Sequence, residues 1–497
     1  MGRTLLSVVL FCVNLLVHGQ FITPGTSVSW TFDDLVLHSG GVVTVDNSIY
    51  MIHGDLTISV NDTLKIISND QVQFDPNVLM TIYGVFIANP PGQAILTASS
   101  PAQFFKGFRF ENSPASALHN CLIEYGGGIQ IIGSDMLVED CVIRYFNKSN
   151  TTGAIQVSQG KVRLVNNEIY QNKGPAIASA ANALAAPQII GCHIWSNNTD
   201  NTNMPQINLG NSGNDTIRIV GNTITGQFDQ AGGIAVSTLA GGDCYSIIED
   251  NIITNNRYGI AAIGSTIHTE IHNNVISDNN IQGNPNLGGS GLNFNGAVTN
   301  TAMVSGNTIN GNLWGITVQG SARPNLGERD FIIVNPGENF FYNNGNNGSL
   351  YALYNNTAQN LKAQYNYWGT TNLDSVEMVI FHQPDDPNLG LVDYMPILIP
   401  LGTDELPLQE KPQNLILNIF PNPMSTLGSV HLNEELMAGR VIQYTILNLN
   451  GITMKKDRVI TKDNRIIIDV GNIENGVYFL SVRSGSKMEI RSIVVSR

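Results

Sequence analysis

The sequence is poor in charge, in cysteine and in long apolar runs. Asp, Glu, Lys and Arg make up only 13% of its 497 residues, about half of the ~25% usual in soluble domains. This scarcity argues against long surface helices and against charged disorder. The chain instead holds 49 glycines and frequent asparagines, which suits a β-rich protein with many turns.

Positive charge is scarce too, and it is unevenly distributed. Residues 1–413 carry 15 basic and 32 acidic side chains, whereas residues 414–497 carry 10 and 7. An acidic body excludes nucleic acid as a natural partner, because phosphate binding needs a basic surface. The change of sign indicates a domain boundary.

A long apolar run occurs only at the start of the chain. Residues 1–19 have a charged beginning at Arg3, an apolar stretch and small residues before Gln20, which predicts a secretory signal cleaved after Gly19. No later run has the length of a membrane span, so we expect an exported protein that is not integral to a membrane. Loss of Cys12 leaves four cysteines, too few for a disulfide scaffold of this size.

One short pattern recurs along the body of the chain: an apolar residue, two others, Asn or Cys, any residue, Ile, two others and Asn. Its first shared column holds Cys121, Cys141, Asn167, Cys192, Asn222, Asn251, Asn274, Asn307 and Asn339. The spacing ranges from 20 residues, between Cys121 and Cys141, to 33, between Asn274 and Asn307. A fixed motif with variable spacing indicates stacked coils with inserted loops. Alternation around each Ile predicts short parallel strands that bury one another's faces.

This pattern resembles the right-handed parallel β-helix repeat of the pectate-lyase-like superfamily, over about residues 30–400. The resemblance implies an all-β solenoid whose Asn column forms an internal ladder at the bend between the second and third sheets. Cysteine fits the same inward slot. Cys121 and Cys141 fall on adjacent coils, where a disulfide or a reduced thiol stack would fit; we favour the thiol stack. Trp368 in NYWG resembles the plug that closes such helices.

The C-terminal segment is predicted to be a small Ig-like β-sandwich of short alternating strands. It resembles the type IX secretion C-terminal sorting domain in Pro421-Asn422-Pro423, Asn450-Gly451, Asn475-Gly476-Val477-Tyr478 and the final Arg497. The resemblance implies export by the type IX machinery to the extracellular space or the outer-membrane surface. The predicted domains are a signal peptide (1–19), a β-helix with an NYWG closing turn (20–400), a linker (401–413) and the sorting domain (414–497).

The superfamily resemblance places any active site on the outward residues of the first sheet. Those residues here include Gln130, Gln156, Asn208, Asn293, Thr317 and Gln319, and none is a general acid or base near neutral pH. Tyr258 and Trp314 border this strip and could stack on sugar rings. We therefore predict a protein without catalytic activity or cofactor, which presents an amide-rich face to an extracellular polysaccharide or glycan or serves in adhesion.

Two other clusters leave alternatives open. Asp229 and Arg257 come from neighbouring coils and are either the base and charge stabiliser of a polysaccharide lyase or hydrolase, or a surface ion pair of little energy. His268, Glu270 and His272 point outward from the second sheet, where zinc could accept them. Their i, i+2 spacing of about 6.6–7 Å is wide for one ion, which favours a solvated polar face. A third possibility is a structural spacer on the cell envelope.

Overall fold

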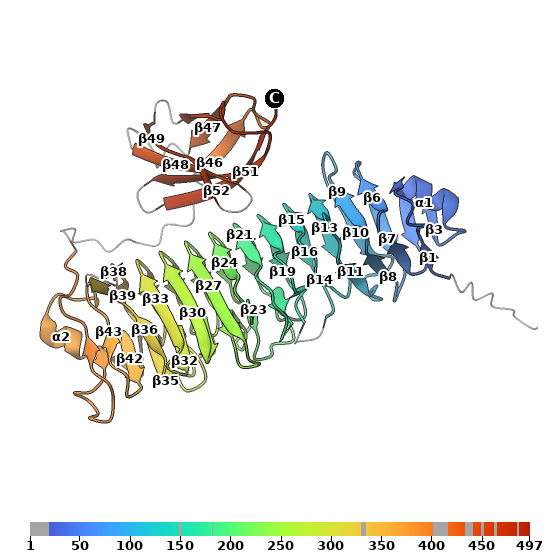
Figure 1. The fold of residues 1–497 in the computed structure, drawn as a ribbon. Helices are drawn as coiled ribbons and strands as arrows, with labels where there is room; N and C mark the ends of the chain where they lie inside the picture. The colour runs from blue at the N-terminus through green and yellow to red at the C-terminus, as the bar shows by residue number, and fades with distance from the viewer. Residues whose placement is uncertain are drawn as a thin grey trace, which may run out of the picture.

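A computed structural model of the chain describes residues 19–148, 152–180, 182–329, 334–400, 416–432, 441–448, 452–461, 465–484 and 487–497. The predicted signal peptide lies outside these residues except for Gly19, and the predicted linker 401–413 and the Asn450-Gly451 turn lie wholly outside them. Residues 20–400 wind into an elongated parallel β-helix (Figure 1).

Three long sheets form the walls of the helix, and we number them in the order in which each coil enters them. The first sheet consists of β1 (Phe21–Ile22), β5 (Leu56–Ile58), β8 (Leu79–Ile82), β11 (Gly107–Glu111), β14 (Ile129–Ile132), β17 (Ile155–Ser158), β20 (Ile177–Ser179), β23 (Pro205–Leu209), β26 (Gly232–Ser237), β29 (Ile260–Gly264), β32 (Ser290–Gly296), β35 (Trp314–Gly320), β42 (Leu353–Asn356) and β44 (Ile380–Phe381).

The second sheet consists of β2 (Ser29–Trp30), β6 (Thr63–Ile66), β9 (Val85–Ala88), β12 (Ala117–His119), β15 (Leu137–Glu139), β18 (Arg163–Val165), β21 (Gln188–Ile190), β24 (Thr216–Val220), β27 (Asp243–Glu249), β30 (Thr266–His272), β33 (Asn300–Ser305), β36 (Arg323–Asn325), β43 (Leu361–Lys362) and β45 (Val392–Asp393).

The third sheet consists of β3 (Val43–Asp46), β4 (Ile49–Ile52), β7 (Gln71–Phe74), β10 (Ala94–Ala98), β13 (Cys121–Glu124), β16 (Val142–Arg144), β19 (Glu168–Tyr170), β22 (His193–Trp195), β25 (Thr223–Thr225), β28 (Ile252–Thr254), β31 (Val275–Ser277), β34 (Thr308–Asn310) and β39 (Phe340–Tyr342). Two small hairpins, β37 (Glu328–Arg329) with β38 (Val334–Asn335) and β40 (Gly345–Asn346) with β41 (Ser349–Leu350), branch from the last coils.

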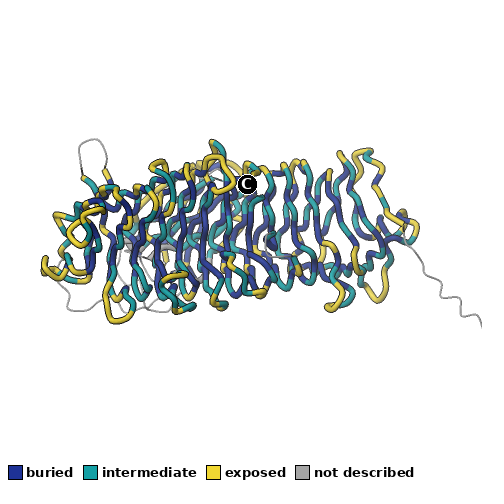
Figure 2. Tube along the Cα trace, turned by 90° about the horizontal axis from the view of Figure 1, so that it is seen from below, coloured by how far each residue is buried: buried dark blue, intermediate teal, exposed yellow. Residues whose placement is uncertain are grey.

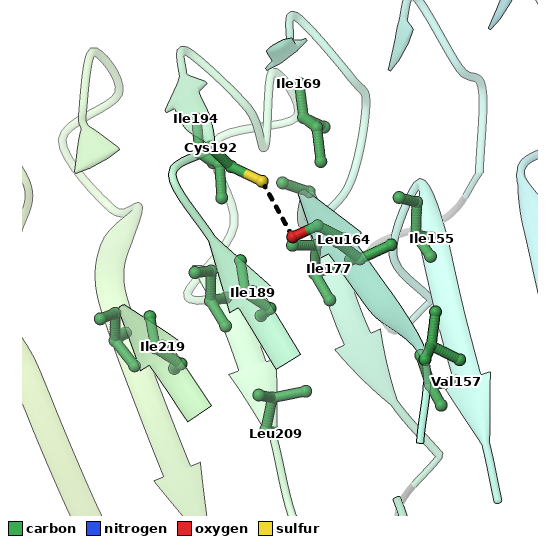
Figure 3. Close-up of a cluster of buried hydrophobic side chains, with 14 of the residues drawn as sticks. Ile155, Val157, Leu164, Ile169, Ile177, Ile189, Cys192, Ile194, Leu209 and Ile219 are labelled. Carbon is green, nitrogen blue, oxygen red and sulfur yellow. Dashed lines mark hydrogen bonds between the residues drawn. The ribbon is translucent and has the colours of Figure 1, made fainter. Parts of the chain in front are cut away.

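The core of the helix is a stack of identical apolar positions. Ile155 pairs in register with Ile177, which pairs with Ile207, and all three are fully buried. Figure 3 shows how such columns from the three sheets meet on the axis, and Figure 2 shows buried segments inside with exposed segments at the corners. The period-2 alternation of the sequence therefore fixes which face of each strand is buried.

The predicted asparagine ladder lies between the second and third sheets. The Oδ1 atom of each rung accepts the backbone N–H of the rung before it, as Asn274 does for Asn251 (3.0 Å) and Asn307 does for Asn274 (2.9 Å). The Nδ2 group donates back to a carbonyl of the preceding coil, from Asn274 to Ile248 (2.9 Å). Each amide thus satisfies polar backbone groups that the bend would otherwise leave buried and unpaired. The ladder ends on Asn366 of the NYWG turn, which accepts from Asn339.

Cysteine serves as a rung in three coils. The thiol of Cys192 donates to the Leu164 carbonyl at 3.5 Å (Figure 3), where an asparagine would place its Nδ2 group. The backbone N–H of Cys121 donates to the Cys141 sulfur at 3.4 Å. All four described cysteines are buried free thiols, so the favoured thiol stack is the state of Cys121 and Cys141.

A second ladder lies between the third and first sheets. Its rungs are Asn172, Asn197, Gln206, Asn256, Asn279, Asn312 and Asn344. Sequence spacing puts Gln227 at the third position, but Gln227 is exposed. Gln206, the second residue of β23, fills this position instead, accepting from Asn197 at 3.1 Å and donating to Asn256 at 3.0 Å.

Both ends of the helix are covered. Helix α1 (Phe32–His38) begins with a Thr31–Asp34 capping box and buries Phe32 and Leu35 against the first coils. At the other end Trp368 is buried and stacks on Phe341, with ring centroids 4.8 Å apart. The short helix α2 (Leu373–Glu377) follows and buries Val376. These contacts hide the apolar core that an open end would expose.

The C-terminal segment is a β-sandwich with its own core. One antiparallel sheet contains β46 (Ile416–Phe420), β47 (Leu427–Leu432) and β50 (Arg465–Asp469); the other contains β48 (Val441–Leu447), β49 (Thr453–Ile460), β51 (Gly476–Ser484) and β52 (Lys487–Val495). The terminal Arg497 donates to the carbonyls of Val470, Gly471 and Ile473. Asn475 accepts the Arg497 backbone N–H at 3.0 Å, so the predicted motif residues close the sandwich.

Candidate functional site

The outward strip of the first sheet is the surface on which we predicted a ligand. Gln130 and Gln156 lie beside each other in register on β14 and β17. Asn208 follows between Ala178 and Ala235. All three amides are partly exposed. Two buried alanines, Ala235 and Ala261, interrupt the strip before it resumes at Asn293.

The strip becomes a bonded network over β32 and β35. The Asn293 amide donates to the Thr317 hydroxyl at 2.6 Å, and Ser290 shares a hydrogen bond with the same hydroxyl at 3.0 Å. Thr317 is therefore buried rather than free to meet a ligand, which corrects our expectation for that residue. Asn295 donates to Gln319 at 3.3 Å, and these two side chains remain accessible.

Trp314 lies at the edge of this network within an aromatic cluster. Its ring centroid is 4.7 Å from that of Tyr351 and 5.0 Å from that of Tyr354. Its indole N–H donates to the Pro285 carbonyl at 3.0 Å, which fixes the ring. Tyr354 pairs in register with Thr317 and stacks on Phe381 at 4.8 Å. The rings are half-buried, so they form a firm platform beside Asn293.

Sequence reasoning missed Tyr351, Tyr354 and Phe381. The coil that carries Tyr354 pairs with β35 across an interval of 37 residues, from Thr317 to Tyr354. The hairpin β40–β41 is inserted within that interval. The alternating segment LYNN places an aromatic residue, Tyr354, in an outward position, and this was visible in the sequence. Its pairing with Thr317 was not predictable, because the inserted hairpin changes the number of residues between the two strands.

Asp229 and Arg257 are not brought together. Asp229 accepts from the Asn201 amide at 2.6 Å. Arg257 is buried and donates to Gln282 at 2.8 Å, to the Leu287 carbonyl at 2.5 Å and to Asn203. No ion pair joins Asp229 and Arg257 within the described residues. The ion-pair interpretation is therefore wrong, while the catalytic interpretation stays a prediction.

Tyr258 packs against the backbone of the preceding coil. Its ring covers Gly232 so closely that a Cβ at that glycine would lie 2.2 Å from the ring. Burial raises the pKa of Tyr258 to about 12, so the phenol stays neutral at physiological pH. The residue is largely buried at the rim of the first sheet, because one side of its ring packs against Gly232.

The residues His268, Glu270 and His272 point outward from β30 as predicted, but their partners are neighbouring side chains. His268 stacks on Tyr245, with centroids 4.9 Å apart, and bonds to Thr301 at 2.9 Å. His272 bonds to Ser305 at 2.7 Å and lies 3.4 Å from Glu270. Among the described residues no group of three His, Cys, Asp or Glu side chains converges on one point as metal ligands must.

The part of the chain that the structure describes contains no helix long and apolar enough to cross a membrane. No curated protein and no solved structure matches the chain. Residues 418–496 match the family model described as the secretion system C-terminal sorting domain. The C-terminal sandwich is thus a type IX sorting domain, which links this protein to that secretion machinery and directs it to the extracellular space or the cell surface.

Proposed function

We propose that this protein is a non-catalytic extracellular or cell-surface protein that binds carbohydrate, or adheres to it, through the first-sheet face. The observation that carries the proposal is the platform of Trp314, Tyr351 and Tyr354 beside Asn293 and Gln319. Aromatic rings offer apolar area to the C–H faces of sugars, and amides match sugar hydroxyls as both donors and acceptors.

The chemistry of the strip supports binding over catalysis. A lyase needs a base and a charge stabiliser, and a hydrolase needs paired carboxylates. The outward residues from Gln130 to Gln319 that we named are amides and a hydroxyl. Asp229 and Arg257, the residues that favoured the lyase or hydrolase alternative, are bonded to other side chains. Carbohydrate binding, in contrast, needs only aromatic and amide side chains, and this face carries both.

Binding is tested with the full chain and soluble polysaccharides in affinity gel electrophoresis. The Trp314→Ala, Tyr354→Ala double variant is expected to lose at least tenfold in affinity. The control is Tyr245→Ala, which removes an aromatic ring that is 37% exposed on the second sheet and should leave binding intact. Equal affinity of the double variant and the wild type would refute this site.

The two alternatives are outcomes of the same set of measurements. Incubation of the wild-type chain with each polysaccharide, with and without divalent cations, should release no unsaturated or reducing ends. Release of such ends would establish a lyase or hydrolase. Absence of binding to every polysaccharide would leave the envelope spacer as the function.

A further inference from the structure

A row of aromatic side chains lies on the outer face of the third sheet, away from the first-sheet platform. Tyr170 and Trp195 point outward from β19 and β22, while Tyr125 and Tyr145 directly follow β13 and β16. We call these four residues the tyrosine strip. Their centroids are 5.1 Å apart from Tyr125 to Tyr145, 6.2 Å from Tyr145 to Tyr170 and 4.1 Å from Tyr170 to Trp195. Successive coils thus contribute one ring each.

Two of these rings are held by an unfavourable backbone. Tyr125 and Tyr145 have φ values of 56° and 57°, in the left-handed region that bulky residues avoid. The same position in later coils is held by Gln171, Ser196, Asn255, Asp278, Gly311 and Asn343. Later coils fill this position mostly with asparagine, aspartate or glycine, which adopt the left-handed region more readily than tyrosine. The two coils that keep a tyrosine here despite the strain point to use of the rings in binding.

The strip is polar at its centre, where one cation is paired with one carboxylate. Arg144 lies 5.0 Å from the Tyr145 ring centroid and donates to the Tyr170 hydroxyl at 2.7 Å. Its charge is balanced by Glu124, which accepts from Arg144 at 2.7 Å and from Thr97 at 3.3 Å. The guanidinium thus holds a phenol in place instead of offering a free cation to an anionic ligand.

We propose that the tyrosine strip is a second binding site, for a neutral linear polysaccharide that lies along the helix axis. The repeat of one ring per coil, about 4.8 Å per step, suits a ligand that is itself periodic, which a folded protein surface is not. The acidic body, with 32 acidic against 15 basic residues, repels polyanionic glycans. Rings with polar edges give apolar contact and hydrogen bonds together. The sorting domain delivers the strip to the exterior, where such polymers occur.

The sharpest test replaces both strained tyrosines by the residue that later coils use. Asparagine tolerates the left-handed region, so the Tyr125→Asn, Tyr145→Asn variant is expected to melt at or above the wild-type temperature. It should nevertheless lose at least tenfold in affinity for the neutral probes xyloglucan and mixed-linkage β-glucan in affinity electrophoresis. Polygalacturonate serves as the polyanionic probe and should bind neither protein. The Tyr245→Asn variant on the second sheet is the matched control and should bind as wild type.

The measurement is made in two backgrounds, since the proposed first-sheet site takes the same class of ligand. In chains that already carry Trp314→Ala and Tyr354→Ala, the remaining binding is expected to disappear with the two Tyr→Asn changes. If the first-sheet proposal is wrong, chains that carry Trp314→Ala and Tyr354→Ala bind glycan as tightly as the wild type. The effect of the two Tyr→Asn changes on affinity can then still be measured in that background. If the strip variant melts lower, Trp195→Thr replaces it, because Thr225 occupies the paired position on the next coil.

Three results would overturn the proposal. Unchanged affinity of both strip variants would show that the rings are structural. Tighter binding of polygalacturonate than of the neutral probes would refute the assignment of the ligand. A wild-type dimer in sedimentation velocity that the strip variant abolishes, without glycan binding, would make the strip a contact between two copies of this chain.

Discussion

At the scale of single residues, the bends of the helix determine which side chains are tolerated. The position before each first-ladder rung has a positive φ in every repeat from Asn120 to Glu338. Its occupants are Asn120, Asp140, Asn166, Gly191, Gly221, Asp250, Asn273, Gly306 and Glu338, and most are the residue types that adopt this region most readily. Asp250 fits this backbone, but its charge does not suit the site.

Asp250 should make the protein less stable as the pH rises. Burial, with a further contribution from Glu249, raises the pKa of Asp250 from 3.8 to about 6. The folded chain therefore holds a proton that the unfolded chain releases, and the stability from this group, complete below pH 3.8, is lost by about pH 6. The Asp250→Asn variant should gain on the order of 2 kcal/mol over the wild type at pH 7.5.

The measurement is urea unfolding of both proteins at pH 4 and pH 7.5. Asn166 and Asn273 adopt φ values of 52° and 55° at the same position, so the substitution introduces no strain. The difference in unfolding free energy between variant and wild type should be small at pH 4 and reach about 2 kcal/mol at pH 7.5. A difference that does not change with pH would contradict the role assigned to the carboxylate.

Residue patterns predicted much of this structure because each repeat obeys the same local rules. The column from Cys121 to Asn339 follows from its fixed offset to the buried Ile, and the first ladder is continuous along it. The second ladder runs from Asn172 to Asn344 and follows its offset at every rung except Gln206. Asn366 was not identified as a rung, because no Ile follows it at the expected offset. The pairing of Trp314 with Tyr351 depends on the path of a loop, which periodicity does not report.

At the scale of elements, a strand of one coil supplies the ladder residue that the next coil lacks. The coil containing Asn222 has no second-ladder asparagine, and Gln206 of β23 fills the gap. This buried amide also donates to the Thr225 carbonyl at 2.9 Å. Removal of the Gln206 amide would take a hydrogen-bond partner from buried polar groups of Asn197, Thr225 and Asn256. Each buried polar group left unpaired costs about 1–3 kcal/mol.

The Gln206→Ala variant is therefore expected to lose about 3 kcal/mol of unfolding free energy. The loss should be local, so hydrogen exchange should accelerate first at the backbone amides around Asn197 and Asn256. Gln227→Ala is the matched control, because Gln227 is exposed in the same region and its removal should change stability by less than about 0.5 kcal/mol. Equal losses in the two variants would show that Gln206 is not a rung.

At the scale of the whole molecule, the two folded parts have different roles. The β-helix offers the repeated outward columns on which we propose binding, while the sandwich of residues 418–496 carries the sorting information. The sandwich has its own buried core, from Ile416 to Val495. Its last residue is tied to Val470, Gly471 and Ile473, so it needs no strand of the β-helix to complete either of its sheets.

Deletion of residues 414–497 is expected to hold the protein inside the cell envelope of a host that has the type IX machinery. The physical reason is that the β-helix keeps its core and both caps without the sandwich, so the truncated chain should fold yet lack the surface that the machinery recognises. Fractionation and immunoblotting measure its location, with the full-length Gln227→Ala chain as an exported control. The converse experiment joins residues 414–497 to an unrelated periplasmic reporter, which should then reach the exterior. Normal export of the truncated chain would show that this domain is not needed for sorting.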